Sequence, residues 1–330
     1  MPKQSNYNKE MKNIKILDCT LRDGGYVNDW CFGKENINKI LFSLYQANID
    51  YIECGYLNEN TVFDNNKCIY QNISQIENPT NNLAIMINYG EFSIENIPDN
   101  CEIIFRIAFK EKDYKNALEF CKQLKNKKCS FFINPMHTNF YNKENLLDLI
   151  NTTNKLKPIA LTITDTIGAM NQKETLEIFN FIDKNLDENI SICFHSHNNL
   201  NLSFLNAKTL IEACKNRELI LDTTVFGIGR GAGNLKTEFL AEYLKSKYDI
   251  KLLSKIKDEI IFPVYDKHAW GFNEAYQISA LYKLHPNYAR FLIEKNVKIE
   301  QTKKILSLIS DKEKLIYNKK LIESLYCTLI

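Results

Sequence analysis

The sequence predicts a (β/α)8 TIM barrel followed by a helical appendage at the C-terminal end. Eight short, β-branched apolar runs recur between residues 14 and 227. Longer amphipathic stretches lie between many of these runs, which is the pattern of repeated βα units. The runs are almost continuously apolar, as expected for parallel strands that are buried on both faces. Eight such strands with intervening helices close most naturally into a barrel.

The expected strands follow one another along the first two thirds of the chain. They cover residues 14–19, 49–56, 83–89, 102–109, 129–135, 159–165, 190–197 and 219–227. Helical periodicity predicts helices that include residues 112–125, 143–156, 172–186, 201–215 and 236–247. An open, doubly wound sheet is the alternative, but such a sheet usually has a glycine-rich fingerprint directly after its first strand. Here the first strand leads instead into the segment TLRDGG at residues 20–25.

The strand pattern stops after residue 250. Helical patterns at residues 275–282, 286–295, 301–308 and 311–325 fill the remainder. We therefore expect a barrel domain over residues 1–250 and a helical domain over residues 251–330. Helices this short are marginal alone, so their apolar faces must pack on the barrel or on another subunit, which is compatible with a homodimer.

Charge and cysteine usage exclude several classes of protein. Lys and Arg number 42 against 40 Asp and Glu, so no strong overall field attracts nucleic acid or an anionic membrane. No stretch reaches the ~18 apolar residues of a membrane span, and the first ten residues lack the apolar core of a signal peptide. The ten cysteines are dispersed without a Cys-x-x-Cys pair, so we expect reduced thiols and a cytoplasmic protein.

Three polar side chains near the expected strand ends form a candidate metal site. His195 and His197 are two residues apart on an extended segment, so their imidazoles project to the same side, and Asp23 offers an oxygen ligand. Two imidazoles and one carboxylate leave coordination positions open for substrate. Without a thiolate, Mn²⁺ or Mg²⁺ is favoured, although Zn²⁺, Co²⁺ or Fe²⁺ would also be accepted. The simpler alternative is a pair of hydrogen-bonded histidines at a strand end.

Two further features lie beside these ligands. Arg22 precedes Asp23, and a fixed guanidinium next to a divalent ion stabilises negative charge on a carbonyl oxygen, as enolate chemistry requires. Its alternative is a solvated loop arginine. The segment GIGRGAGN at residues 227–234 follows the last strand and suggests a phosphate-binding loop. It lacks the Lys-Ser/Thr pair of a P-loop, so a tight turn that carries Asn234 over the barrel mouth is an equal alternative.

Three motifs together carry a family resemblance. LDCTLRDGG at residues 17–25, FHSHNN at residues 194–199, and GIGRGAGN followed by Thr-Glu within residues 227–238 resemble the DRE-TIM metallolyase superfamily. That superfamily includes HMG-CoA lyase, isopropylmalate and homocitrate synthases, and 4-hydroxy-2-oxovalerate aldolase. The resemblance covers residues 14–245. The segment WGFNEAY from residue 270 makes the hydroxy-oxovalerate aldolase branch the nearest one.

The resemblance implies roles for particular residues. Asp23, His195 and His197 would ligate the metal, Asn234 would complete the shell, and Arg22 would stabilise a pyruvate enolate.

Two acids are expected on the substrate side of the same mouth. Asp165 looks like the superfamily's substrate-side acid, with a helix cap as the alternative. Glu53 lies at the end of the second strand and faces the mouth by position.

One position departs from the superfamily pattern. Hydroxy-oxovalerate aldolases have a histidine shortly after the Arg-Asp pair that acts as the base on the 4-hydroxyl, and here Tyr26 stands there. A tyrosine with an ordinary pKa near ~10 is a poor base at neutral pH. Tyr26, Tyr276 or a metal-bound water would replace the histidine, or the substrate differs.

The expected function is a divalent-metal-dependent aldolase. It would cleave or form the C3–C4 bond of a 4-hydroxy-2-oxo acid, so its small-molecule partners would be a 2-oxo acid and an aldehyde. The alternatives are a Claisen-type synthase that joins an acyl-CoA to a 2-oxo acid, and a catalytically inactive metal-binding barrel that serves as a partner subunit. The resemblance also implies that the helical tail docks an aldehyde dehydrogenase.

Overall fold

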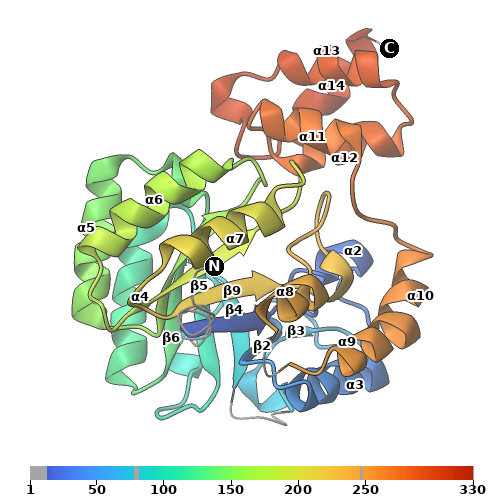
Figure 1. Cartoon of the computed structure of the whole chain (residues 1–330). Coiled ribbons are helices and arrows are strands. Elements are labelled where there is room, and N and C mark those ends of the chain that lie inside the picture. The colour runs from blue at the N-terminus through green and yellow to red at the C-terminus, as the bar shows by residue number, and fades with distance from the viewer. Residues whose placement is uncertain (1–12, 78–81, 246–247, 330) are drawn as a thin grey trace, which may run out of the picture.

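Eight parallel strands close into a barrel at the centre of the molecule (Figure 1). The computed structural model describes residues 13–77, 82–245 and 248–329. The strands pair in the order β1-β9-β8-β7-β6-β5-β4-β2, and a further pairing of β1 with β2 closes the ring. This confirms the predicted TIM barrel and excludes the open sheet. The strands are β1 (Ile14–Asp18), β2 (Tyr51–Leu57), β4 (Leu83–Asn88), β5 (Ile104–Phe109), β6 (Phe131–Pro135), β7 (Ala160–Asp165), β8 (Ser191–Ser196) and β9 (Leu219–Thr223).

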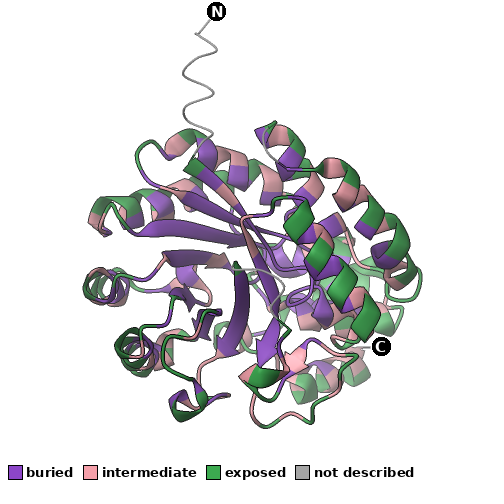
Figure 2. Cartoon of the chain, turned by 90° about the horizontal axis from the view of Figure 1, so that it is seen from below, coloured by how far each residue is buried: buried purple, intermediate pink, exposed green. Residues whose placement is uncertain are grey.

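The strands are buried because their side chains fill two separate cores. One set points into the barrel, where Leu17, Phe132 and Ile220 belong to a single cluster. The other set packs under the surrounding helices, and Figure 2 shows buried strands inside a ring of helices that are exposed on their outer faces. Each apolar run predicted as a strand overlaps one of the barrel strands, as the two buried faces require. A short extra strand, β3 (Ile69–Tyr70), pairs with β2 outside the ring.

Helices follow most of the strands, but not all. Among the described residues, no α-helix lies in the β2–β4 or β4–β5 connection: the first holds β3 and the short turn η2 (Ile73–Gln75), and the second holds the short turn η3 (Ile94–Asn96). Asparagine side chains cap two of the helices that are present: Asn142 caps α5 and Asn171 forms a capping box with Glu174 at α6. The outer layer comprises α2 (Gly25–Asn28), α3 (Lys34–Gln46), η4 (Glu111–Asp113), α4 (Tyr114–Asn126), η5 (Thr138–Phe140), α5 (Lys143–Leu156), α6 (Gln172–Asn185), α7 (Ser203–Ala213), η6 (Val225–Gly227) and α8 (Thr237–Leu244).

The C-terminal appendage has a core of its own. It consists of α11 (Glu274–Leu281), α12 (Pro286–Glu294), α13 (Ile299–Ser307), η8 (Asp311–Glu313) and α14 (Lys319–Leu329). Tyr288, Leu292 and Ile305 lie at its centre. The helix predicted over residues 311–325 is wrong in its first half, because the Tyr288 hydroxyl lies 2.9 Å from the carbonyls of Glu313 and Ile316. The chain is thereby held in an irregular segment before α14 begins.

The segment that links barrel and appendage packs with the barrel. It contains α9 (Ile250–Ile256), the π-helical turn η7 (Lys257–Ile261) and α10 (Phe262–Tyr265). α9 contacts α3 and α8, and Leu253 and Ile261 belong to the barrel core. The domain boundary predicted at residue 250 stays a prediction, and we propose a boundary within residues 266–273 on this packing. Among the described helices, none has both the length and the apolar character needed to cross a membrane.

Candidate active site

A cavity of about 420 Å³ opens at the carboxyl ends of the barrel strands. This is the end at which TIM barrels carry their active sites. The appendage covers part of it, since His285 and Tyr317 lie on the cavity wall. Residues from the end of β8 and from the loops after β1, β6, β8 and β9 meet here: Arg22, Asp23, Tyr26, His137, His195, His197 and Arg230.

The predicted metal ligands come together in this cavity. Asp23, His195 and His197 are all buried, and their ligand atoms lie within 4.8 Å of one another. The His197 Nδ1 atom lies 3.1 Å from the carbonyl oxygen of Asp165. A carbonyl only accepts hydrogen bonds, so Nδ1 must carry the proton and Nε2 presents a lone pair. That Nε2 is buried and has no hydrogen-bond partner among the described residues, which a merely structural histidine would not leave.

Asp23 is held as an ionised carboxylate. Its Oδ1 accepts a hydrogen bond of 2.6 Å from Arg22 Nη1, and its Oδ2 accepts one of 2.6 Å from Asn234 Nδ2. Burial alone would raise the pKa of Asp23, but the charge of the Arg22 guanidinium outweighs it and holds this pKa well below its usual range. The Asn234 Oδ1 atom is buried without a partner among the described residues. A divalent cation therefore fits this set of groups, which comprises one carboxylate, two imidazoles and a free amide oxygen.

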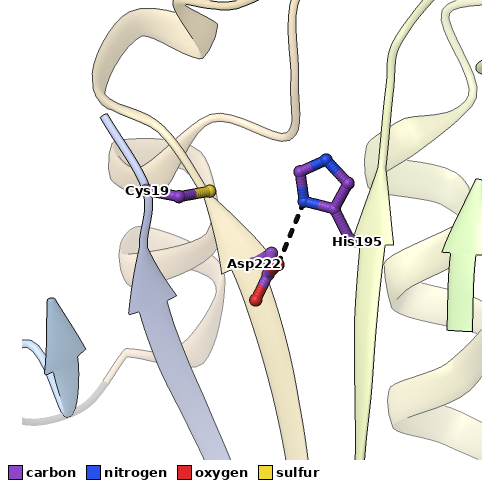
Figure 3. Close-up of side chains that lie close together, drawn as sticks. All are labelled: Cys19, His195 and Asp222. Atoms are coloured by element: carbon purple, nitrogen blue, oxygen red, sulfur yellow. Dashed lines mark hydrogen bonds and ion pairs between the residues drawn. The ribbon is translucent and has the colours of Figure 1, made fainter. Parts of the chain in front are cut away.

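A second group of ligand types lies next to the first. Figure 3 shows Cys19, His195 and Asp222 pointing toward one another at the ends of β1, β8 and β9. The Asp222 carboxylate already accepts hydrogen bonds from Cys193 and from Arg106, the latter at 2.6 Å, and burial raises the pKa of the Cys19 thiol well above its usual value. The Asp222 carboxylate also lies 3.0 Å from His195 Nδ1, so this group orients the imidazole.

Buried ion pairs connect the two sides of the site inside the barrel. Arg22 Nε donates to Glu53 at 2.7 Å, and Arg106 donates to Glu53 at 3.0 Å and to Asp222 at 2.6 Å. Arg106 and Glu53 are fully buried, and an unpaired charge there would be very costly. The chain of contacts therefore fixes Arg22 beside Asp23 and, through Asp222, the ring of His195. Arg106 and Asp222 were missed in the sequence, where their signal is a charge within an apolar strand run.

The two acids expected to face substrate contact other groups of the protein. Glu53 binds Arg22 and Arg106 below the cavity. The Asp165 carboxylate accepts backbone hydrogen bonds from Ala169 at 2.9 Å and Met170 at 3.1 Å, and burial raises its pKa to about 6. The structure places neither acid on the cavity wall. We propose positioning roles for both, since Glu53 holds Arg22 and Asp165 holds the loop that orients His197.

Both candidate tyrosines line a smaller cavity beside the main one, but only Tyr26 also lines the main cavity. Tyr26 lines the main cavity, and its hydroxyl lies 2.9 Å from the hydroxyl of Tyr56. Tyr276 lies beside a neighbouring cavity of about 190 Å³, and burial raises its pKa.

Two histidines that no motif marks also line the main cavity. Burial, followed by the charge of Arg230, lowers the pKa of His137 to about 4 and that of His285 to about 2. Both rings are therefore neutral near pH 7. His285 comes from the appendage, at the N-cap of α12, so only the folded chain brings it to the barrel mouth. Four of the five histidines in the chain meet in this cavity.

Comparison with known proteins indicates the class of enzyme that this chain resembles. A model of the HMGL-like family matches residues 100–260, and the resemblance to the DRE-TIM metallolyase superfamily is thereby confirmed. Among individual proteins, the chain is 26% identical over 270 residues to the 4-hydroxy-2-oxovalerate aldolase of Bacillus thuringiensis (strain Al Hakam), which covers 76% of each chain. These similarities support a metal-dependent lyase or aldolase.

Solved structures agree on the fold. The N-terminal domain of a candidate aldolase from Bacteroides vulgatus superimposes with a TM-score of 0.73 at 26% identity, over 84% of this chain and 96% of that one. An HMG-CoA lyase from Brucella melitensis gives a TM-score of 0.58 at 12% identity, over 74% of this chain and 96% of that one. The second likeness shows the shared barrel alone.

Proposed function

We propose that the protein is a divalent-metal-dependent aldolase that cleaves or forms the C3–C4 bond of a 4-hydroxy-2-oxo acid, with pyruvate and an aldehyde as the other reactants. The observation that carries this proposal is the buried group of Asp23, His195 and His197, with Arg22 held against it in one cavity. The names of the curated relatives support the same reaction class.

Asp23, His195 and His197 would hold the ion, and the free amide oxygen of Asn234 would add a further ligand. Oxygen and imidazole ligands without a thiolate favour Mn²⁺ or Mg²⁺. When bound, the ion supplies a Lewis acid for the carboxylate and 2-oxo oxygens of the substrate.

Arg22 is preorganised to stabilise the charge that develops as the bond breaks. Its Nε and Nη1 atoms are held by Glu53 and Asp23, so the guanidinium does not need to reorient during the reaction. It lines the cavity and presents positive charge to the 2-oxo oxygen of a pyruvate enolate. Fixed donors of this kind account for a large share of catalysis in enolate and acyl chemistry.

The proton of the 4-hydroxyl needs an acceptor on the cavity wall. Tyr276 lies outside the main cavity, and burial makes its hydroxyl harder to ionise. His137 is on the wall and neutral, and its Nδ1 is buried with no hydrogen-bond partner among the described residues. We therefore propose His137 as the base, with Tyr26 as the alternative.

The proposal is tested by pyruvate release. Metal-free protein is mixed with a panel of 4-hydroxy-2-oxo acids, and pyruvate is followed with lactate dehydrogenase. We expect release that requires Mn²⁺ or Mg²⁺ and that falls ~10²-fold or more in His137→Asn but less in Tyr26→Phe. The opposite order would assign the proton to Tyr26. No metal-dependent pyruvate from any substrate would overturn the function, and thiol release from acetyl-CoA would indicate the Claisen-type synthase.

The assembly around this activity stays a prediction. The apolar faces of the helical tail suggest a homodimer, the resemblance implies an aldehyde dehydrogenase partner, and the sequence suggests a cytoplasmic location. Leu281 and Leu308 of the appendage are 64% and 55% exposed, which leaves apolar surface for a contact of either kind.

A further inference from the structure

One part of the cavity wall has positive charge without a matching acid. Arg230 lines the cavity with its guanidinium 5.1 Å from the ring centre of Tyr26. Its Nη2 contacts only the backbone oxygen of Thr166, at 3.4 Å, and its Nε is buried without a partner. Lys110 lies on the same wall. Within the described residues neither cation forms an ion pair with a carboxylate, although an arginine in such a place is normally paired.

Both cations act on the two histidines of the same wall. Burial is the largest cause of the lowered pKa of His137, and the positive charges of Arg230 and Lys110 come next. Both charges also lower the pKa of His285. The acids on the cavity wall besides Asp23 are Glu91 and Asp113, and neither is among the neighbours that shift these two histidines. Arg230 and Lys110, which form no ion pair within the described residues, therefore present positive charge to this part of the cavity.

The wall also offers unused hydrogen-bonding groups. Asn134 is 4% exposed, lines the cavity, and has a buried Oδ1 with no partner among the described residues. The Thr164 Oγ1 atom is likewise buried and unpartnered there. Buried polar atoms are normally satisfied, so these two point to a polar ligand. The volume of about 420 Å³ lies within the ~300–1,000 Å³ of sites for drug-sized ligands, which exceeds what a two-carbon aldehyde needs.

The glycines on either side of Arg230 allow the turn to pack closely against neighbouring side chains. A Cβ on Gly229 would lie 2.1 Å from Asn234 Nδ2, and one on Gly231 would lie 2.6 Å from Asn199 Oδ1. The glycines thus let the turn approach Asn234 and Asn199, which supports the tight-turn interpretation of residues 227–234. The charge that the segment presents to the cavity comes from the Arg230 side chain.

We infer that the aldehyde part of the substrate carries an anionic group, a carboxylate or a phosphate, which binds at Arg230 and Lys110 while its hydroxyl groups bind Asn134 and Thr164. The inference rests on the proposed aldolase function and names its substrate class. Arginine is suited to this task because its guanidinium binds both anions through two parallel hydrogen bonds.

The kinetic test runs the reaction in the direction of aldol addition with pyruvate and Mn²⁺. Succinic semialdehyde is compared with butanal, and glyceraldehyde 3-phosphate with glyceraldehyde. We expect kcat/KM for one anionic aldehyde to exceed that of its neutral partner by about tenfold or more. Arg230→Gln should reduce this ratio about tenfold, whereas Lys122→Gln on the exposed side of α4 should keep it. A preference for succinic semialdehyde over butanal would identify a carboxylate, and a preference for glyceraldehyde 3-phosphate over glyceraldehyde would identify a phosphate.

A binding test separates this inference from the aldolase function. Succinate and glycerol 3-phosphate, with glycerol as the neutral control, are titrated into wild-type protein and Arg230→Gln by calorimetry. Anion binding that depends on Arg230, without turnover of any aldehyde, would keep the anion site and overturn the aldolase. Turnover without anionic preference, or a preference that Arg230→Gln and Lys110→Gln leave intact, would overturn the inference alone. Neither binding nor turnover would overturn both.

Discussion

Asp23→Ala is expected to abolish divalent-metal binding and pyruvate release together. The carboxylate is the single acidic member of the ligand group and lies against both Arg22 and His197. Its loss removes the oxygen ligand and its negative charge, and it leaves the positive Arg22 guanidinium unpaired beside the two imidazoles, where it repels a cation. Turnover should fall by ~10³-fold or more, since the metal supplies several kcal/mol of charge stabilisation. Metal content by mass spectrometry and the coupled pyruvate assay measure the two effects.

Controls separate the loss of the ligand from a loss of folding. Asp23→Asn retains the shape of the side chain, and His195→Ala removes a different ligand; both should lose the metal while their circular dichroism spectra stay native. Asp258→Ala changes an exposed acid in η7 and should bind metal as the wild type does. If Asp23→Ala and His195→Ala both retain the wild-type metal stoichiometry, the site is not at these residues.

Arg22→Ala should retain the metal but lose ~10²-fold or more in kcat, as when a transition-state hydrogen-bond donor is removed. The change should appear mainly in kcat, with a smaller change in KM, because the guanidinium acts on charge that develops during bond cleavage. Arg22→Lys should recover little activity, since an ammonium group cannot contact Glu53 and Asp23 through two separate nitrogens.

Arg22→Ala also removes a partner from two buried carboxylates. Urea unfolding therefore accompanies the kinetics, and the assays are run at a temperature where the variant is folded. A folded Arg22→Ala protein with wild-type turnover would show that this arginine is structural.

The barrel was predictable because each strand is buried on both faces. That requirement produces a short apolar run at every strand, and the eight runs were visible in order. That His195 and His197 lie together was predictable because residues 195 and 197 project to one side of an extended segment. Both features depend on local sequence alone.

The remaining features depend on contacts between distant segments. Arg106 and Asp222 pair across the barrel at a separation of 116 residues, which no local pattern reveals. His285 reaches the cavity only because the appendage folds over the barrel mouth. The helix predicted over residues 311–325 is interrupted by the hydroxyl of Tyr288, a residue on α12. Glu53 was expected at the barrel mouth because the sequence does not reveal its hydrogen bond with Arg106.

The location of a bound ion shows directly whether Asp23, His195 and His197 form the metal site. Crystals grown with Mn²⁺ would be measured at a wavelength where manganese scatters anomalously. We predict one strong peak at ~2.0–2.3 Å from an Asp23 oxygen and from the Nε2 atoms of His195 and His197. A peak on the Cys19 and Asp222 side of His195, or an occupied manganese site that none of Asp23, His195 and His197 ligates, would contradict it.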